Sequence, residues 1–162
     1  MKRRPLTHAE LLARMPRAFR PKLRHDQVRD LAMVHLVNLD AIAHGQGTPD
    51  LLRDVVESIF TWSRVAELLQ AGVPEMRAQL EMAEQLIERF KRTGRVGFNG
   101  AEYQLAKDGI GYMDQLAEIV DQRTAIEAAD WSEHHLAGLR HGANPCTCAT
   151  PSGPDYCPEH AA

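Results

Sequence analysis

The amino-acid sequence predicts an all-α protein, and three observations support that prediction. Apolar residues recur at intervals of three and four over four long stretches, which is the spacing of a helix that buries one face. Prolines, glycines and polar capping residues stand between these stretches, where helices begin and end. The stretches are similar in length and are joined by short turns, a pattern typical of an up-and-down four-helix bundle. We expect the four helices over residues 26–44, 49–71, 74–93 and 100–123.

The first expected helix contains the most apolar stretch of the chain, residues 31–43, which only His35, Asn38 and Asp40 interrupt. A helix that is apolar nearly all round belongs inside a bundle. The stretch is too short to cross a bilayer, which needs about 20 apolar residues. We therefore expect this helix, capped by Asp26, to be the most buried element. His35 and Asn38 share one face, where they either line a pocket or hydrogen-bond to neighbouring groups, as buried polar side chains generally do.

Capping residues define where the other three helices begin. Thr48 offers an N-cap hydroxyl directly before Pro49, and proline is well suited to the first helical position. Pro74 opens the third helix in the same way. Asn99 and Glu102 have the spacing of a capping box, in which two side chains satisfy each other's backbone N–H groups before the fourth helix.

The remaining helical features concern packing. Gly109 and Gly111 each cost about 1 kcal/mol relative to alanine inside a helix, so we expect a close helix–helix approach or a kink there.

Thr124 with Glu127 offers another cap, so the segment to about residue 140 is either a fifth helix or a continuation of the fourth. In the third helix the expected buried stripe is Met76, Leu80, Ala83, Ile87 and Phe90. The predicted core consists of Leu31, Leu39, Ile59, Leu80, Ile87, Met113 and Leu116.

Charge divides the chain into a basic arm and an acidic body. Residues 1–30 contain nine Lys/Arg and three Asp/Glu, a net charge of +6, and the remaining residues contribute −9 to the total of −3. We expect a basic N-terminal arm over 1–25, a helical domain over 26–141 and a Cys/His-rich tail over 142–162. No apolar stretch of a signal peptide follows the basic N-terminus, and no transmembrane stretch is present, so we expect a cytoplasmic protein with no membrane partner.

The basic arm supports two interpretations. It could follow the phosphates of a nucleic acid, while Phe19 stacks on a base. The residues that would do so are Arg14, Arg17, Arg20, Lys22 and Arg24. The favoured interpretation is that the arm covers the acidic body of its own molecule or an acidic face of a partner, because the domain as a whole is acidic and matches no recognised nucleic-acid-binding fold. Phe19 and Leu23 would then anchor it.

The tail carries the strongest chemical signal. Its four candidate zinc ligands are three thiolates and an imidazole, a set that Zn²⁺ favours in closed structural sites. They are Cys146, Cys148, Cys157 and His160, with His141, His134 or His135 as alternative fourth ligands. Prolines between the two pairs stiffen the loop and lower the entropy that binding would cost. The alternative is an unstructured tail with three free thiols.

No catalytic constellation is evident elsewhere. A nucleophile elbow, a Walker loop and a His-Glu-x-x-His motif are all absent from the sequence. A carboxylate-bridged metal centre would need a Glu-x-x-His motif from each of two helices, and the helical region contains none. We therefore expect a protein that is not an enzyme.

The turn before the fourth helix, Phe-Lys-Arg-Thr-Gly-Arg-Val-Gly-Phe-Asn-Gly at 90–100, carries a family resemblance. It resembles the Arg-Thr-Gly-Arg turn between the last two long helices of small helical proteins from plasmids and prophages of Gram-negative bacteria. The similarity covers residues 26–125. It implies an origin in a mobile genetic element. On that basis we expect an accessory protein that binds another protein, such as a host or defence component, with a nucleic-acid-binding regulator as the alternative.

Overall fold

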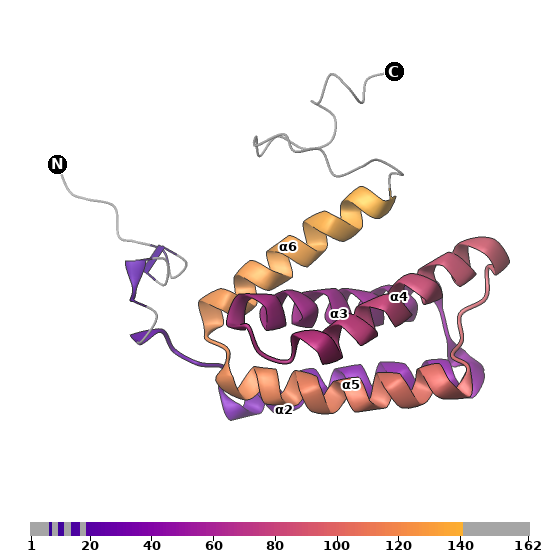
Figure 1. Cartoon of the computed structure of the whole chain (residues 1–162), viewed down its shortest axis with the longest axis horizontal. Helices are drawn as coiled ribbons and strands as arrows, with labels where there is room; N and C mark the ends of the chain where they lie inside the picture. The colour runs from indigo at the N-terminus through magenta and orange to yellow at the C-terminus, as the bar shows by residue number, and fades with distance from the viewer. Residues whose placement is uncertain (1–6, 8–9, 12–13, 17–18, 141–162) are drawn as a thin grey trace, which may run out of the picture.

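A computed structural model of the protein describes residues 7, 10–11, 14–16 and 19–140, with side chains to residue 137. Within these residues the chain forms five long α-helices and no strand, so the predicted all-α class is confirmed (Figure 1). A short π-helix, η2 (Ile42–Gln46), extends the first of them. The five helices are α2 (His25–Ala41), α3 (Pro49–Leu69), α4 (Val73–Thr93), α5 (Gly100–Ile119) and α6 (Gln122–Arg140).

Two of the predicted helix starts are confirmed by their caps. The Thr48 hydroxyl accepts a hydrogen bond from the Leu51 backbone N–H at 3.2 Å, and Pro49 opens α3. The Asn99 side chain accepts from the Glu102 N–H at 2.9 Å, while the Glu102 carboxylate accepts from the Asn99 N–H at 2.8 Å. In the arm, Thr7 and Glu10 make the same reciprocal pair of bonds, at 3.3 Å and 2.7 Å. Caps are predictable because they depend on residues only three positions apart.

Two of the predicted helix caps, Asp26 and Thr124, are wrong. Arg24, not Asp26, is the N-cap of α2, and Gln27 accepts from the Arg24 N–H at 3.0 Å. Asp26 pairs instead with the Arg24 guanidinium at 3.0 Å.

The expected fourth helix is interrupted, so α5 and α6 are separate. The backbone of Val120 is extended after α5. Asp121 then accepts from the N–H and the hydroxyl of Thr124, at 3.1 Å and 2.8 Å. Asp121 therefore caps α6, and Thr124 is the capped residue, not the predicted cap.

Helix α3 is the centre of the packing. Figure 1 shows α2 beside α5 in one layer, α3 with α4 in the next, and α6 lying over α3. Helix α3 contacts each of the other four helices, and nine of its side chains are buried. Val55, Ile59 and Ala66 are fully enclosed. The α3 helix, and not α2, is thus the most buried element.

The prediction that α2 is the most buried helix is wrong. Its side chains Leu31, Met33, Val34 and Val37 are 48%, 53%, 62% and 58% exposed. Within α2 only His35 and Leu39 are buried. The reason is position: α2 lies at the edge of the bundle, packs mainly against α5 and touches α3 less extensively. One stripe of the helix is therefore enough to fill its share of the core.

The predicted core is otherwise largely present. Leu39, Ile59, Met113 and Leu116 are buried, Leu80 and Ile87 are half-buried against the core, and Leu31 is exposed. In α4 the buried stripe is rotated from the expected one, because the helix packs on both α3 and α5. Its buried residues are Met76, Gln79, Met82, Ala83 and Leu86.

The close helix approach expected at Gly109 is confirmed. A Cβ atom at Gly109 would lie 2.5 Å from Cδ of Gln79, so a larger residue would force the buried Gln79 side chain to move. The Gln79 amide donates to the Leu105 carbonyl at 2.7 Å across the same contact. Gly111 has open space around it and has no such packing role.

Candidate functional site

The outward side of α2 forms an exposed apolar surface. Residues Met33, Val34 and Val37 follow the three- and four-residue spacing of one helix face, so their side chains lie next to one another. Asp26 and Asp30 continue the same face toward the N-terminus of the helix, and both are exposed. We call these five residues the outer face of α2. It combines apolar side chains with two carboxylates at one end, each of which lies beside an arginine.

A groove with a volume of about 800 Å³ runs beside this face, between α2, α3 and α6. Its apolar lining includes Leu31, Val34, Trp62, Val65, Ala125 and Ile126. Three carboxylates, those of Asp30, Asp54 and Glu57, also line it. Among the described residues, none that lines the groove is a lysine or an arginine. The groove is therefore apolar with three carboxylates in its lining, and two of these, Asp30 and Asp54, lie beside Arg29 and Arg53.

His35 lies at the base of this groove and is 6% exposed. Burial lowers its pKa from the usual 6.5 to about 4, because the interior disfavours the imidazolium. It also borders a small cavity with Met113 and Asp114. Burial is the main cause that raises the pKa of Asp114, and the neighbouring Glu118 carboxylate raises it further. His35 and Asn38 both line the groove, which was the first of the two options for this pair. Neither side chain hydrogen-bonds to any residue in the described part of the chain.

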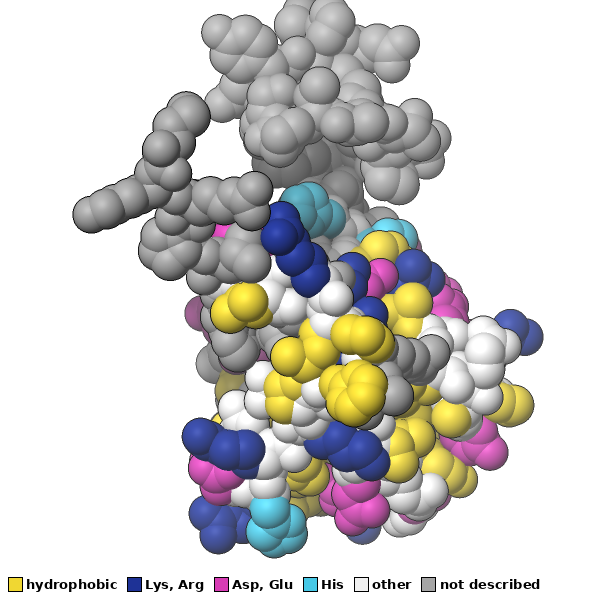
Figure 2. Space-filling view, turned by 90° about the vertical axis from the view of Figure 1, so that its left-hand side faces the viewer, with side chains coloured by type: hydrophobic (Ala, Val, Ile, Leu, Met, Phe, Trp, Pro, Cys, Tyr) yellow, Lys and Arg dark blue, Asp and Glu magenta, His cyan; other side chains and the backbone are white. Residues whose placement is uncertain are grey.

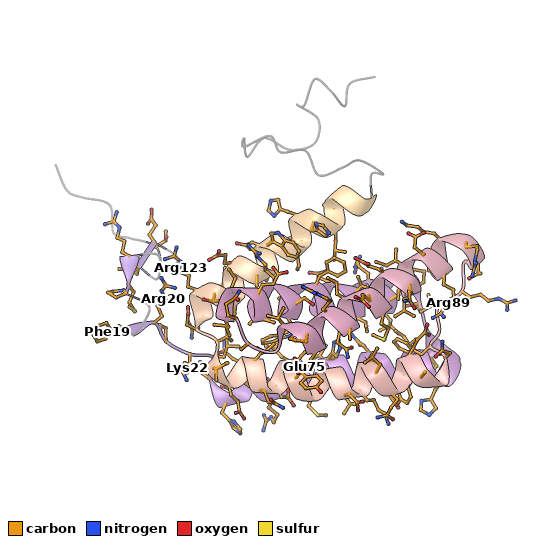
Figure 3. All side chains as sticks on the ribbon, viewed as in Figure 1. Phe19, Arg20, Lys22, Glu75, Arg89 and Arg123 are labelled. Carbon is orange, nitrogen blue, oxygen red and sulfur yellow. The ribbon has the colours of Figure 1, made fainter. Side chains whose placement is uncertain are left out.

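The arm joins the bundle at the junction of α5 and α6. The Pro21 carbonyl accepts from the Gln122 N–H at 2.9 Å, and Lys22 forms an antiparallel β-bridge with Asp121. Arg20 lies 3.9 Å from the Asp121 carboxylate. In Figure 3, Arg20 and Lys22 lie at this junction and Phe19 points away from the bundle. This attachment fixes Pro21 and Lys22 against the start of α6.

Of the five residues predicted for nucleic-acid binding, the structure describes four. Arg14 and Lys22 are exposed, whereas Arg17 lies outside the described residues. Arg20 is largely covered and donates to the Met15 carbonyl at 3.1 Å, and Arg24 is paired with an aspartate.

Of the two expected arm anchors, one is correct. Leu23 packs against the core. Phe19 is 76% exposed, so it does not anchor the arm on its own chain. Figure 2 looks onto the end of the molecule where the arm joins the bundle, and hydrophobic side chains are gathered there with both basic and acidic side chains around them.

The predicted zinc ligands Cys146, Cys148, Cys157 and His160, with the alternative His141, lie outside the described residues. The other two alternatives are engaged within α6. The His134 ring nitrogen Nδ1 lies 2.6 Å from the Asp130 carbonyl, and the His135 ring stacks on Trp131 at 4.9 Å. Among the described residues, no cluster of three or more His, Cys, Asp or Glu side chains could hold a metal ion.

Sequence reasoning missed the role of Arg89, labelled in Figure 3. Its guanidinium donates to both oxygens of Glu102, at 2.9 Å and 2.7 Å, and to the Gly97 carbonyl at 2.8 Å. These bonds lower the pKa of Glu102 and raise that of Arg89. The signal that could have indicated this contact was an arginine at a half-buried position near the end of α4, together with the capping-box glutamate at the start of α5.

The loop that follows the Arg-Thr-Gly-Arg turn, which carries the family resemblance, is thus held by Arg89 through Gly97 and Glu102. No helix in the described part of the chain is long and apolar enough to cross a membrane. No protein-family model, no curated protein and no solved structure matches the chain, so the resemblance to plasmid and prophage proteins stays a prediction.

Proposed function

We propose that this protein is a non-enzymatic binding protein that holds another protein against the outer face of α2. The supporting observation is that Met33, Val34 and Val37 are each more than half exposed on one helix. Contiguous exposed apolar side chains on a protein surface commonly mark an interaction site. Covering them removes apolar area from water, which contributes roughly 25 cal/mol per Å².

The charge of the outer face defines the chemistry of the partner. Asp26 and Asp30 lie at one end of the apolar patch, and Asp40 lies near the other. A partner surface that matches this pattern is apolar in its centre and basic at its edges, because opposite charges at the rim of an interface favour encounter and orientation.

Hydrogen bonding in the groove supports a role other than catalysis. Among the described residues that line the groove, His35 is the histidine. If it acted as a general base, it would accept a hydrogen bond from the hydroxyl of its nucleophile. The Thr61 hydroxyl bonds instead to Ser132 at 2.7 Å, and His35 bonds to no described residue.

The test is affinity capture from the host of origin with matched variants of the full chain. In one variant Met33→Asp and Val37→Asp place charges on the outer face. In the control, Gln85→Asp places a charge at an exposed position of α4. We expect both proteins to keep the helical circular dichroism of the wild type. The double variant should capture at least about tenfold less partner than the wild type. Equal capture by both would contradict the proposal.

We also propose that the protein is a cytoplasmic accessory protein of a mobile genetic element, whose partner is a host or defence component. The Arg-Thr-Gly-Arg turn at 92–95 supports this proposal. For the architecture, we propose that α2–α5 form an up-and-down four-helix bundle with α6 added. The packing of α3 on α4 and of α4 on α5 supports that arrangement.

A second candidate is a nucleic-acid-binding regulator that uses the arm. The exposure of Phe19 beside the basic residues Arg14 and Lys22 favours it, because an exposed aromatic ring can stack on a base. Phosphate contacts make the logarithm of the affinity fall by roughly 0.9 per contact for each tenfold rise in salt. Binding of DNA or RNA with such a slope, abolished by removing residues 1–25, would favour this function over the protein-binding one.

For the tail we propose a structural zinc site made by Cys146, Cys148, Cys157 and His160. Four protein ligands would leave no open position for a substrate water. We expect about one zinc per untagged chain by elemental analysis, and loss of the metal in Cys148→Ser and Cys157→Ser. Retention of zinc in His160→Ala and its loss in His141→Ala would identify His141 as the fourth ligand. A metal-free protein with three freely titrating thiols would exclude the site.

A further inference from the structure

We propose that the groove between α2, α3 and α6 binds the basic N-terminal arm of a second copy of this chain, so that two copies exchange arms. This surface is distinct from the outer face of α2, although Asp30 and Val34 belong to both.

The groove itself limits what can occupy it. Leu31, Val34 and Ile126 are 48%, 62% and 47% exposed along its lining, so an occupant must supply apolar side chains. Asp30 and Asp54 each lie beside an arginine of their own helix, whereas the Glu57 carboxylate has no ion-pair partner among the described residues. The carboxylates favour an occupant with positive charge. The occupant is therefore an apolar and basic segment.

The arm of this chain has that chemistry. Residues 1–24 contain eight Lys/Arg and a single acidic residue, Glu10. Two of its described apolar side chains, Leu11 and Phe19, are 49% and 76% exposed. Glu10, Leu11 and Arg14 are helical, and the capping box of Thr7 and Glu10 begins that turn. An amphipathic helical segment in an apolar groove is a recurrent mode of recognition between proteins.

The attachment of the arm explains why the occupant is a second copy. Residues Pro21 and Lys22 are held on Asp121 and Gln122, and Gln122 and Leu23 line the groove at its edge. The exposed ring of Phe19 points away from the bundle (Figure 3). The arm thus joins its own chain beside the groove, while the Phe19 ring faces away from that chain. A neighbouring copy can receive it while the attachment stays intact, and reciprocal exchange gives a closed dimer with twofold symmetry.

The test is the sedimentation behaviour of the full chain and of matched variants. We expect the wild-type chain to be a dimer at micromolar concentration. In the arm variant, Leu11→Asp and Phe19→Asp together should raise the dimer dissociation constant at least about tenfold. Ile126→Asp in the groove should do the same. The control is Ile119→Asp on α5, since Ile119 is 49% exposed, much like Ile126, and does not line the groove.

Mixing the two defective proteins separates arm exchange from other dimers. A pair made of the arm variant and the Ile126→Asp variant retains one intact arm and one intact groove that can meet. We expect this mixture to form heterodimers, detected by native mass spectrometry, at concentrations where each variant alone is monomeric.

Three results would overturn the proposal. They are a monomeric wild-type chain, a dimer that survives the arm or Ile126→Asp variant, and a mixture that forms no heterodimer. A monomeric chain whose groove captures a foreign protein or a nucleic acid in an Ile126-dependent way would assign the groove to that partner instead. The Met33→Asp and Val37→Asp variant tests the proposed function separately, because neither residue lines the groove.

Discussion

His35 makes the stability of this protein depend on pH. Its pKa is about 4 in the folded protein because the ring is buried, against 6.5 in the unfolded chain. The unfolded state therefore takes up the proton first, so the stabilisation is complete above pH 6.5 and is lost as the pH falls toward 4. Each unit of pKa difference is worth about 1.4 kcal/mol. We expect the free energy of unfolding to fall by roughly 2–3 kcal/mol between pH 7 and pH 4.5 from this residue.

Urea unfolding at both pH values checks the contribution of His35. In His35→Gln the decrease should be smaller by that amount, and comparing the two proteins removes the contribution of Asp114, which faces the same small cavity. Replacement of the exposed His44 by glutamine serves as the control. Identical pH dependence in the wild type and His35→Gln would contradict the expected effect.

Gly109 and Gly111 form a matched pair of glycines within α5. At Gly109 a new methyl group would lie 2.5 Å from Cδ of Gln79, whose amide is buried and bonded to Leu105. We expect Gly109→Ala to destabilise the protein by roughly 1–3 kcal/mol, as overpacked cores do. Gly111→Ala meets open space and should be neutral or stabilising by up to about 1 kcal/mol. Equal effects in urea unfolding would show that α4 and α5 do not approach closely at Gly109.

At the scale of the elements, Arg89 and Glu102 join the end of α4 to the start of α5. The two-pronged bond is partly shielded from water, so it should contribute more than a fully exposed ion pair. We expect Arg89→Leu to lower the free energy of unfolding by roughly 1–2 kcal/mol, since Gly97 and Glu102 then lose a donor. Arg92→Leu, at an exposed position three residues further on, is the control for loss of charge.

Helix α2 shows how an element can be apolar without being buried. One stripe, with His35 and Leu39, faces the core, and the opposite stripe, with Met33 and Val37, faces outward. Two apolar stripes on one helix look the same in the sequence as a helix enclosed on all sides. The second stripe here instead supports the proposed protein-binding function.

At the scale of the whole molecule, arm exchange predicts that dimerisation depends on salt. The arm is basic and the groove carries carboxylates, and exposed charges are screened over about 10 Å at 0.1 M salt and about 3 Å at 1 M. We expect the dimer dissociation constant from sedimentation to rise as NaCl is increased from 0.05 M to 0.5 M. A dimer held only by apolar contacts would show the opposite trend or none.

The candidate surface was only partly predictable. The sequence indicated a buried His35, and His35 is 6% exposed. The groove was not predictable, because Asp54, Ile126 and the arm attachment come from segments far apart in the chain. The zinc ligands lie outside the described residues and remain a prediction from ligand type and spacing.

Local chemistry in the sequence was sufficient for the helices themselves. The caps at Thr48 and Asn99 and the turn at Gly94 depend on residues a few positions apart, and each appears where the sequence predicts it. Which side of each helix is buried was decided only by tertiary packing. Periodicity reveals that a helix has an apolar face, whereas burial depends on how many neighbouring helices cover that face. Helix α3 has neighbours on several sides and is enclosed, while α2 lies at the edge and leaves an apolar face open to water.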